Sequence, residues 1–473
     1  MVLATGADTW ANESKVDFIQ QVQPILAKKC FACHGPDEAE GGLSFSTPET
    51  AFAETDSGEH AIVPGDIDAS QLMVRITSDD EHERMPPEGD EVTPEEIKLL
   101  KQWIEEGAEW NKHWAFVEMQ RHDPPAVDNA KWNNNPIDAF VLDRLAAANL
   151  TPNPPADRET LIRRAYYDLL GLPPTVDQVR KFVDDPDPRA FDKLVDELLE
   201  SPHYGERWAR YWLDLVRYAE TNSYERDGPK PNAWKYRDYV IRSFNDDKPY
   251  DQFVREQIAG DELDEVTVDS LTATGYYRLG IWDDEPVDPL QARFDGLDDI
   301  IMTTGQAFLA LTVNCARCHD HKIDPIPQSD YYSMLSFLED LTPYGNRGDQ
   351  TTFSQIDVSP EELRAQYENS LEDKAKIETT MREIEQAGIV KMSAPDQRAT
   401  EGPKKDRNRV LNEKLKDHLS DEQWAEYRDL KKRLKQNTDD YKKLPPRETV
   451  MGLAKYRKID SPTFVLFRGN PTS

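Results

Sequence analysis

Hydrophobic residues recur along most of this chain at intervals of three and four, the spacing that places them on one face of an α-helix. Such apolar stripes begin at Phe18, Ile137, Leu161, Phe191 and Ile300. The pattern predicts a mainly α fold whose core is built from the inward faces of helices.

The first segment, residues 16–114, reads as a small domain with a helix at each end. Glycine- and proline-rich stretches fill its middle, where a loop is expected. Thr93 to Glu96 should open the closing helix, because Thr93 is a good N-cap, Pro94 suits the first helical position and Glu96 completes a capping box. The apolar stripe of that helix is Ile97, Leu100 and Ile104.

A linker and a larger helical domain follow. Clustered proline and asparagine residues predict a linker over 115–135, and helical stripes predict a domain over 136–344. The stripe that begins at Ile300 is expected to form a helix leading to Cys315. An aromatic face is predicted either to pack in the core or to wall a cofactor; it consists of Trp208, Tyr211, Trp212 and Leu215.

The remaining chain differs in character. Residues 359–443 are charged and helix-favouring, and they predict a long helical hairpin that is partly coiled-coil-like and serves as a solvated spacer. Residues 444–473 read as an extended segment, with a β-prone stretch at 463–469 that lacks pairing partners. We expect this segment to be the start of a further domain.

All four cysteines lie in two copies of one pattern, C-x-x-C-H, at residues 30–34 and 315–319. This is the attachment signature of c-type haem, in which each thiol adds to a vinyl group and the histidine binds the iron. The sequence therefore predicts two covalently attached haems. Their thioethers would come from Cys30, Cys33, Cys315 and Cys318, and their proximal ligands would be His34 and His319.

Three other uses of the cysteines are less consistent with the sequence. A zinc site would need long-range assembly of the two pairs and gives no role to the histidines. A thioredoxin-like dithiol needs a strand–turn–helix setting, whereas the flanks read as helices. Simple disulfides suit an oxidising compartment but also leave both histidines unexplained.

Helix, C-x-x-C-H motif, loop with methionine and closing helix is the order of a small class I cytochrome c. Met85, in the run Met85-Pro86-Pro87, is the predicted sixth ligand of the first iron, because a thioether holds haem iron in both redox states and raises its potential. The adjacent prolines would stiffen its loop. Met73 and His82 are the alternative ligands.

The second haem has no evident distal ligand in the sequence. The candidates by residue type are Met302, Met334, Tyr331 and His203, and a five-coordinate iron is the other option. His321 is too close to His319 to reach the opposite haem face, so hydrogen bonding to a haem propionate suits it better.

An open second iron would make three neighbouring residues, His321, Arg317 and Tyr331, candidates for proton transfer or charge stabilisation. We favour the structural reading, in which these residues satisfy internal hydrogen bonds and pair with propionates.

Charge narrows the range of partners. The net charge is -33, with 90 acidic against 57 basic residues. This balance argues against nucleic-acid binding and favours a basic redox partner, although an acidic, salt-tolerant surface explains it equally well. No apolar run reaches the length of a transmembrane helix.

The expected location is periplasmic or otherwise extracytoplasmic, because covalent haem attachment takes place outside the cytoplasm. The first residues have neither the charged nor the apolar region of a signal peptide. We therefore expect Met1 to stand in place of a removed signal peptide.

The assembled motifs resemble a known multidomain family. Residues from Phe18 to Trp114 resemble the planctomycete-type cytochrome c domain, and those from Pro136 to Tyr344 resemble the domain of unknown function that commonly follows it. The residues that carry the resemblance are Cys30, Cys33, His34, Met85–Pro87, His113–Phe116, Ser201–Trp208, Trp212–Tyr218, Gln257–Asp261 and Cys315–Pro325. The resemblance implies an exported haem protein, and a further domain after the run Arg468–Pro471.

Three functions remain open from the sequence. The first is a dihaem electron carrier, or the electron-transfer portion of a larger oxidoreductase. The second is a redox enzyme with an open second haem as its catalytic centre. The third is a binding module whose helical domain presents Trp and Tyr platforms to a carbohydrate or a partner protein.

Overall fold

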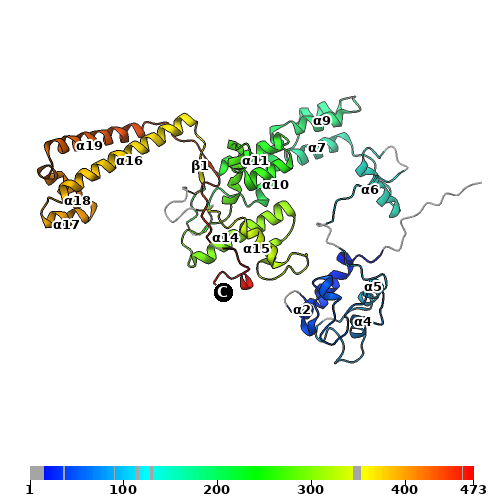
Figure 1. Ribbon diagram of the computed structural model, residues 1–473. Helices are drawn as coiled ribbons and strands as arrows, with labels where there is room; N and C mark the ends of the chain where they lie inside the picture. The colour runs from blue at the N-terminus through cyan, green and yellow to red at the C-terminus, as the bar shows by residue number, and fades with distance from the viewer. Residues whose placement is uncertain are drawn as a thin grey trace, which may run out of the picture.

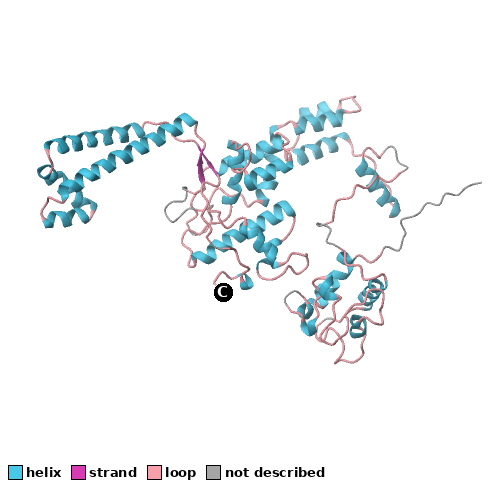
Figure 2. Ribbon diagram, in the orientation of Figure 1, coloured by secondary structure: helices cyan, strands magenta, loops and turns pink. Residues whose placement is uncertain are grey.

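The computed structural model describes residues 15–35, 38–89, 91–111, 117–127, 132–224, 226–342, 344, 353–460 and 462–472. The fold is mainly α, as predicted (Figures 1 and 2). Within these residues the named strands are β1 (Gln355–Asp357) and β2 (Thr449–Met451), which pair antiparallel with Ile356 opposite Val450. Helices thus determine the placement of both C-x-x-C-H motifs.

The N-terminal unit is a small bundle around its own core. A π-helical turn, η1 (Phe18–Val22), leads into α1 (Gln23–Lys29), and α5 (Pro94–Glu105) closes the unit. Trp103 on α5 packs against Phe18, with ring centroids 5.4 Å apart. The other elements of the unit are α2 (Phe31–His34), η2 (Glu40–Gly42), α3 (Pro48–Ala51) and α4 (Gln71–Ile76).

The predicted start of the closing helix is confirmed. The Thr93 hydroxyl accepts a hydrogen bond from the Glu96 amide at 3.2 Å, and the Glu96 carboxylate accepts one from the Thr93 amide at 2.8 Å. This capping box satisfies two helix-end donors and fixes where α5 begins. Leu100 and Ile104 from the predicted stripe are buried in the core.

The next helices form two separate pieces. Helix α6 (Pro136–Ala147) buries Ala139 and Leu142, but most of its predicted apolar stripe is exposed, because no other element covers that face in the described residues. Helices α7 (Arg158–Leu169), α8 (Val176–Val183) and α9 (Ala190–Leu199) pack around a core of their own.

The central body surrounds the second motif. It is built from α10 (Pro202–Leu215), α11 (Ala233–Asn245), α12 (Tyr250–Ala259), α13 (Val268–Ala273), η4 (Thr274–Arg278), α14 (Pro289–Thr304), η5 (Gly305–Leu309), η6 (Val313–Arg317) and α15 (Gln328–Ser336). These elements share one large hydrophobic core.

The predicted helix into the second motif is interrupted. Helix α14 ends at Thr304, a π-helical turn follows, and Ala310 has a left-handed φ of 54°. The chain then tightens into the 3₁₀ turn η6, which carries Cys315. A left-handed residue cannot continue a right-handed helix, so the motif begins on a new turn.

The charged segment forms the predicted hairpin, which projects from the central body in Figure 1. Its long arms, α16 (Glu361–Ile389) and α19 (Asp421–Tyr441), pack on each other, and α17 (Ala394–Glu401), α18 (Lys404–Lys414) and η7 (Leu415–His418) join them. The far end is more than a solvated spacer, because it has its own hydrophobic core.

The C-terminal segment returns to the central body. Met451, at the end of β2, and Leu453, just after it, are buried in the core of that body. The expected strand at 463–469 is not formed; this stretch is irregular and ends in the 3₁₀ turn η8 (Phe467–Gly469). Contacts with the second motif, described below, hold the stretch instead of strand pairing.

Candidate haem sites

The first motif lies at a break between two helices. Cys30 ends α1 and caps α2 with φ −122° and ψ −31°, so Cys33 and His34 lie on the short second helix. The His34 carbonyl accepts a hydrogen bond from the Phe45 amide at 2.8 Å. The His34 ring lies edge-on to the buried Phe45 ring, with centroids 6.1 Å apart. These contacts position the imidazole beside the two thiols.

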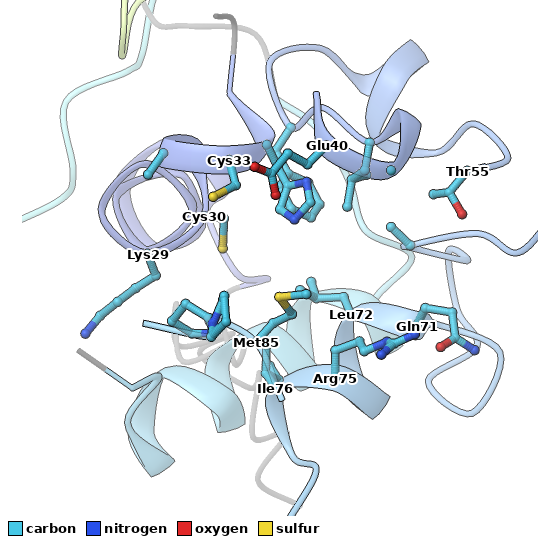
Figure 3. Close-up of a pocket in the computed structure, with 18 of the residues that line it drawn as sticks. Lys29, Cys30, Cys33, Glu40, Thr55, Gln71, Leu72, Arg75, Ile76 and Met85 are labelled. Atoms are coloured by element: carbon cyan, nitrogen blue, oxygen red, sulfur yellow. The ribbon is translucent and has the colours of Figure 1, made fainter. Parts of the chain in front are cut away.

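A cavity of about 630 Å³ opens beside this motif and is lined by Cys30, Cys33 and His34. Its volume lies within the roughly 300–1,000 Å³ that cofactor pockets occupy. Figure 3 shows Met85 across the cavity from the two cysteines, with its sulfur turned toward the space between them. The apolar lining includes Leu43, Phe45, Ala61, Leu72 and Ile76.

The alternative ligands lie elsewhere. Met73 is only 6% exposed and belongs to the hydrophobic core, and His82 is exposed on the loop before Met85. Neither lines the cavity. The Met85 amide donates a hydrogen bond to the Arg75 carbonyl at 3.1 Å, which fixes the Met85 loop against α4. Among the three predicted sixth ligands, Met85 is therefore the one that faces the motif.

The pKa values of both thiols of the first motif are raised, whereas a reactive nucleophilic thiol has a lowered pKa. Burial, and then the charge of Glu96, raises the pKa of Cys30 to about 12. Burial, followed by Glu40 and Glu38, also raises the pKa of Cys33. Thioredoxin-like dithiols have lowered thiol pKa values, so this environment argues against that alternative.

The residues around the cavity fit a covalently bound haem. They supply two uncrosslinked thiols, an imidazole, a facing thioether and apolar walls. The His34 Nδ1 atom is buried and has no hydrogen-bond partner in the described residues. A haem would occupy the apolar space, take thioether bonds from the cysteines and accept the imidazole and the thioether as iron ligands.

The second motif is more exposed than the first. Cys315 and Cys318 are exposed thiols at the edge of the central core, while Ala316 between them is fully buried. The His319 Nδ1 atom lies 2.7 Å from the Asp320 carbonyl oxygen. Because Nδ1 donates to this carbonyl, the other ring nitrogen, Nε2, keeps its lone pair for a metal.

The His321 side chain forms hydrogen bonds that stabilise its own loop. Its Nδ1 atom accepts backbone hydrogen bonds from Ile323 at 3.2 Å and Asp324 at 2.7 Å. Its Nε2 atom lies 2.9 Å from the Thr312 hydroxyl. With Nδ1 acting as an acceptor, the ring is the neutral tautomer that carries its proton on Nε2. These contacts favour the structural reading of this residue over a catalytic one.

Arg317 and Tyr331 are engaged with carboxylates of α14. Arg317 contacts Asp295 at 2.8 Å and Asp298 at 3.4 Å. The Tyr331 hydroxyl donates to Asp298 at 2.7 Å, and burial together with this carboxylate raises the Tyr331 pKa. Burial raises the pKa of Asp298 although both partners oppose the shift. The network anchors the second motif to α14.

The candidate distal ligands occupy different environments. His203 is exposed at the start of α10 and pairs with Glu206 at 2.7 Å. Met302 is half-buried on α14, and Met334 packs against the central core. Tyr331 already donates its hydroxyl proton to Asp298. The arrangement does not single out one of the four.

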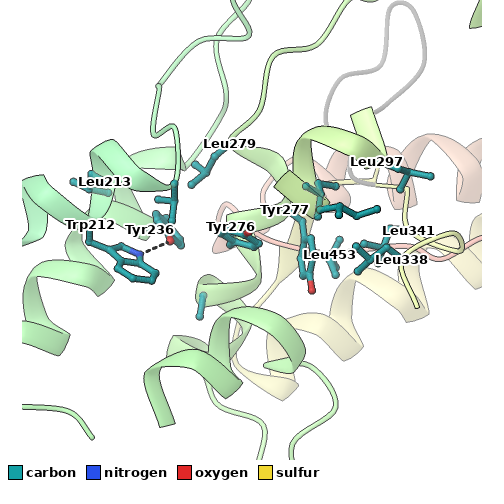
Figure 4. Close-up of a cluster of buried hydrophobic side chains, with 14 of the residues drawn as sticks. Trp212, Leu213, Tyr236, Tyr276, Tyr277, Leu279, Leu297, Leu338, Leu341 and Leu453 are labelled. Atoms are coloured by element: carbon teal, nitrogen blue, oxygen red, sulfur yellow. Dashed lines mark hydrogen bonds between the residues drawn. The ribbon is translucent and has the colours of Figure 1, made fainter. Parts of the chain in front are cut away.

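The aromatic face predicted on α10 divides between core and surface. Trp212 is buried, and its Nε1 atom donates to the Tyr236 hydroxyl at 3.2 Å (Figure 4). The same atom donates to the Gln257 side-chain oxygen at 3.2 Å. Tyr211 and Leu215 are exposed. Trp212 therefore serves core packing, one of the two predicted roles of this face.

Sequence reasoning missed the C-terminal turn as part of the second site. The Arg317 Nε atom donates to the Gly469 carbonyl at 3.3 Å, and the Gln328 side chain donates to the Leu466 carbonyl at 3.3 Å. Gly469 has φ 69°, and a Cβ atom there would lie 2.9 Å from Cys318 Sγ. A glycine followed by Asn-Pro was the available signal, since it marks a turn.

Replacing Gly469 by alanine should loosen this turn. Strain at positive φ and the clash with Cys318 together should cost about 1–3 kcal/mol of local stability. Hydrogen exchange at the amides of Gly469 and Asn470, which donate within the turn at 3.1 Å, should accelerate. Gly402→Ala is the control, since a Cβ there finds ordinary contacts. Unchanged exchange in Gly469→Ala would show that the turn tolerates a side chain.

Two family models match the chain. Residues 30–89, which include the first motif and Met85, match the family described as Planctomycete cytochrome C. Residues 136–342, which include the second motif, match a family described as Protein of unknown function (DUF1549). The resembling run 113–116 lies outside the described residues.

No curated protein and no solved structure matches the chain. In the part of the chain that the structure describes, no helix is both long and apolar enough to cross a membrane. The chain therefore carries a c-type cytochrome domain of the planctomycete family, which implies covalently bound haem, followed by a domain of the DUF1549 family.

Proposed function

We propose that this protein is an extracytoplasmic dihaem c-type cytochrome that passes electrons between its two haems as part of a larger oxidoreductase. The observation that carries the proposal is the first cavity, where both thiols of one motif, His34 and Met85 line the same space. His34 and Met85 would supply an imidazole and a thioether to the haem iron, a ligand pair that suits reversible one-electron transfer at a raised potential.

Attachment requires only the residues present and the haem vinyl groups. Each thiol of Cys30 and Cys33 would add across one vinyl double bond, so that an S–C bond and a C–H bond form without an oxidant. His34 Nε2 and Met85 Sδ would then hold the iron. The haem would supply the redox chemistry, while the chain fixes its orientation and excludes water from one face.

The second motif would act in the same way through Cys315, Cys318 and His319. Its imidazole is already oriented by the hydrogen bond to the Asp320 carbonyl. The side chain of Gln23, on the helix that leads to the first motif, donates a hydrogen bond to the Ile323 carbonyl in the loop after the second motif. This contact supports exchange of electrons between neighbouring sites.

Location and partner follow from chemistry and charge. The extracytoplasmic location rests on the place where c-type haem is attached and on the matched cytochrome family. A net charge of -33 would draw a basic redox partner through long-range attraction.

Haem stoichiometry tests the proposal. When the chain is matured in a c-type haem system, a pyridine haemochrome assay should show two haems per chain. Cys315→Ala with Cys318→Ala, or Cys30→Ala with Cys33→Ala, should leave one haem. His122→Ala, an exposed histidine outside both motifs, is the control and should keep two. One haem in the unmodified chain would refute the dihaem assignment.

The ferric spectrum separates electron transfer from the enzymatic alternative. Two low-spin signals would support electron transfer. One high-spin haem that binds cyanide or carbon monoxide would support an open catalytic iron at the second motif instead.

A further inference from the structure

Three basic side chains meet inside the central body, away from the contacts of both motifs. Arg217 follows α10, Lys230 precedes α11 and Arg278 ends η4. Arg278 is 2% exposed and Lys230 is 4% exposed, while the Arg217 side chain is 20% exposed. We call these three residues the cationic cluster. Residues of this kind are almost never so deeply buried unless they are paired.

The cationic cluster has too little negative charge around it. Arg217 forms an ion pair with Asp299 at 2.7 Å. Arg278 and Lys230 contact only neutral oxygens, those of Asn222 and the Leu279 carbonyl, each at 2.5 Å. In the described ranges, no carboxylate forms an ion pair with either of them. Of the three cations, only Arg217 is therefore in direct contact with a carboxylate. The cluster has an excess of buried positive charge.

Several donors of the cationic cluster are also left without acceptors. The Nε and Nη1 atoms of Arg278 and the Nε atom of Arg217 are buried and have no hydrogen-bond partner within the described residues. The Tyr344 hydroxyl beside them is also buried and has no hydrogen-bond partner within the described residues. Unsatisfied buried polar atoms are rare in folded proteins and commonly mark the place of a water or an ion.

The surroundings hold Arg278 rigidly. Its guanidinium lies 4.8 Å from the Tyr344 ring and 5.5 Å from the Trp282 ring, and the two rings stack. A Cβ on Gly280 would lie 2.5 Å from Asp299 Oδ2 and 2.7 Å from the Tyr344 hydroxyl. The glycine thus keeps a side chain out of this polar space.

Electrostatics agree with the geometry. Burial, then the charges of Arg278 and Arg217, lowers the pKa of Lys230 to about 7, although Asp299 and Asp227 oppose the shift. Burial also lowers the pKa of Arg278 to about 10. An added negative charge would relieve this repulsion.

We propose that the cationic cluster is a binding site for one carboxylate or a comparably small oxyanion. The unsatisfied groups are N–H and O–H donors, so the complementary ligand is a group made of acceptors, and guanidinium binds such oxyanions through charge-assisted hydrogen bonds.

Two sources could supply this anion. One is a free small carboxylate or oxyanion. The other is a propionate of the haem at the second motif, because neighbouring residues of α14 reach both sites: Asp298 contacts Arg317 of the motif and Asp299 contacts Arg217. Of the two sources, only the propionate depends on the proposed second haem.

Calorimetric titration of the haem-loaded protein with sulfate and with acetate, in chloride-free buffer of low ionic strength, tests the site. One-to-one binding is expected if the site is open to free ligands. Arg278→Met should weaken this binding about ten- to hundredfold, the loss that one charge-assisted hydrogen bond produces. Arg163→Met is the matched control, because Arg163 also lies over a tyrosine ring, at 4.7 Å, but on the surface.

Asp299→Asn guards against a folding artefact. It removes the one paired carboxylate and should tighten anion binding severalfold, a change that misfolding cannot produce. Weaker or unchanged binding in Asp299→Asn would overturn the free-ligand form of the site.

If neither anion binds the holoprotein, the propionate source is tested by resonance Raman spectroscopy. Lys230→Met and Arg278→Met should then shift a haem propionate-bending band that Arg163→Met leaves in place. No anion binding and no band shift would overturn the proposal. A protein with a single haem would refute the dihaem function. The calorimetric anion titration would still test whether the cationic cluster binds an anion.

Discussion

Replacing Met85 by alanine is expected to convert the first haem from a low-spin to a high-spin ferric state. Met85 lines the cavity opposite Cys30 and Cys33, so its loss would leave the iron without its thioether ligand. The reduction potential should fall by on the order of 0.1 V or more, within the roughly 0.8 V range over which axial ligands set haem potentials. Electron paramagnetic resonance and a spectroscopic redox titration measure the two effects.

The matched variants separate ligation from general damage. Met85→His should keep the haem low-spin but still lower the potential, because imidazole replaces the thioether. Met73→Ala removes a methionine from the core of the same domain and should leave the spin state unchanged. A high-spin signal in Met73→Ala with none in Met85→Ala would assign the ligand to Met73.

Replacing Trp103 by alanine should destabilise the cytochrome domain by about 3–5 kcal/mol, the cost of emptying a large buried aromatic site. Trp103 is 1% exposed, and its Nε1 atom donates to the Glu109 carbonyl at 3.0 Å. It also packs on Phe18 of the turn that leads to the first motif. Denaturant unfolding followed by absorbance of the first haem should show an earlier transition.

Lys101→Ala on the same helix is the control for this prediction. Lys101 is exposed, so its replacement should change the unfolding free energy by no more than about 0.5 kcal/mol. Equal effects of the two substitutions would mean that the Trp103 side chain does not support the core around the first motif.

Local signals predicted much of the architecture. The capping box at Thr93 and Glu96 gave the start of α5 correctly, because both partners lie within one helical turn. The helical stripes also predicted the long hairpin. They did not predict that the face of α6 around Ile137 is exposed, since a stripe shows only that a face is apolar and not that another element covers it.

The break before Cys315 was likewise not readable from the pattern. Apolar residues continue at helical spacing through the break, so the pattern does not show that Ala310, which is exposed, takes a left-handed conformation. The expected strand at 463–469 failed for a related reason. Strand propensity needs a neighbouring edge, and this stretch instead meets the second motif through Arg317 and Gln328.

The sequence by itself determined the two C-x-x-C-H motifs, their thiols and their histidines, because that chemistry is written within five consecutive residues. Only the tertiary structure shows that Met85 lines the cavity beside the first motif and that Met73 and His82 do not. It alone brought the cationic cluster together from three separate segments. Contacts between residues distant in sequence depend on how whole elements pack, which local spacing does not encode.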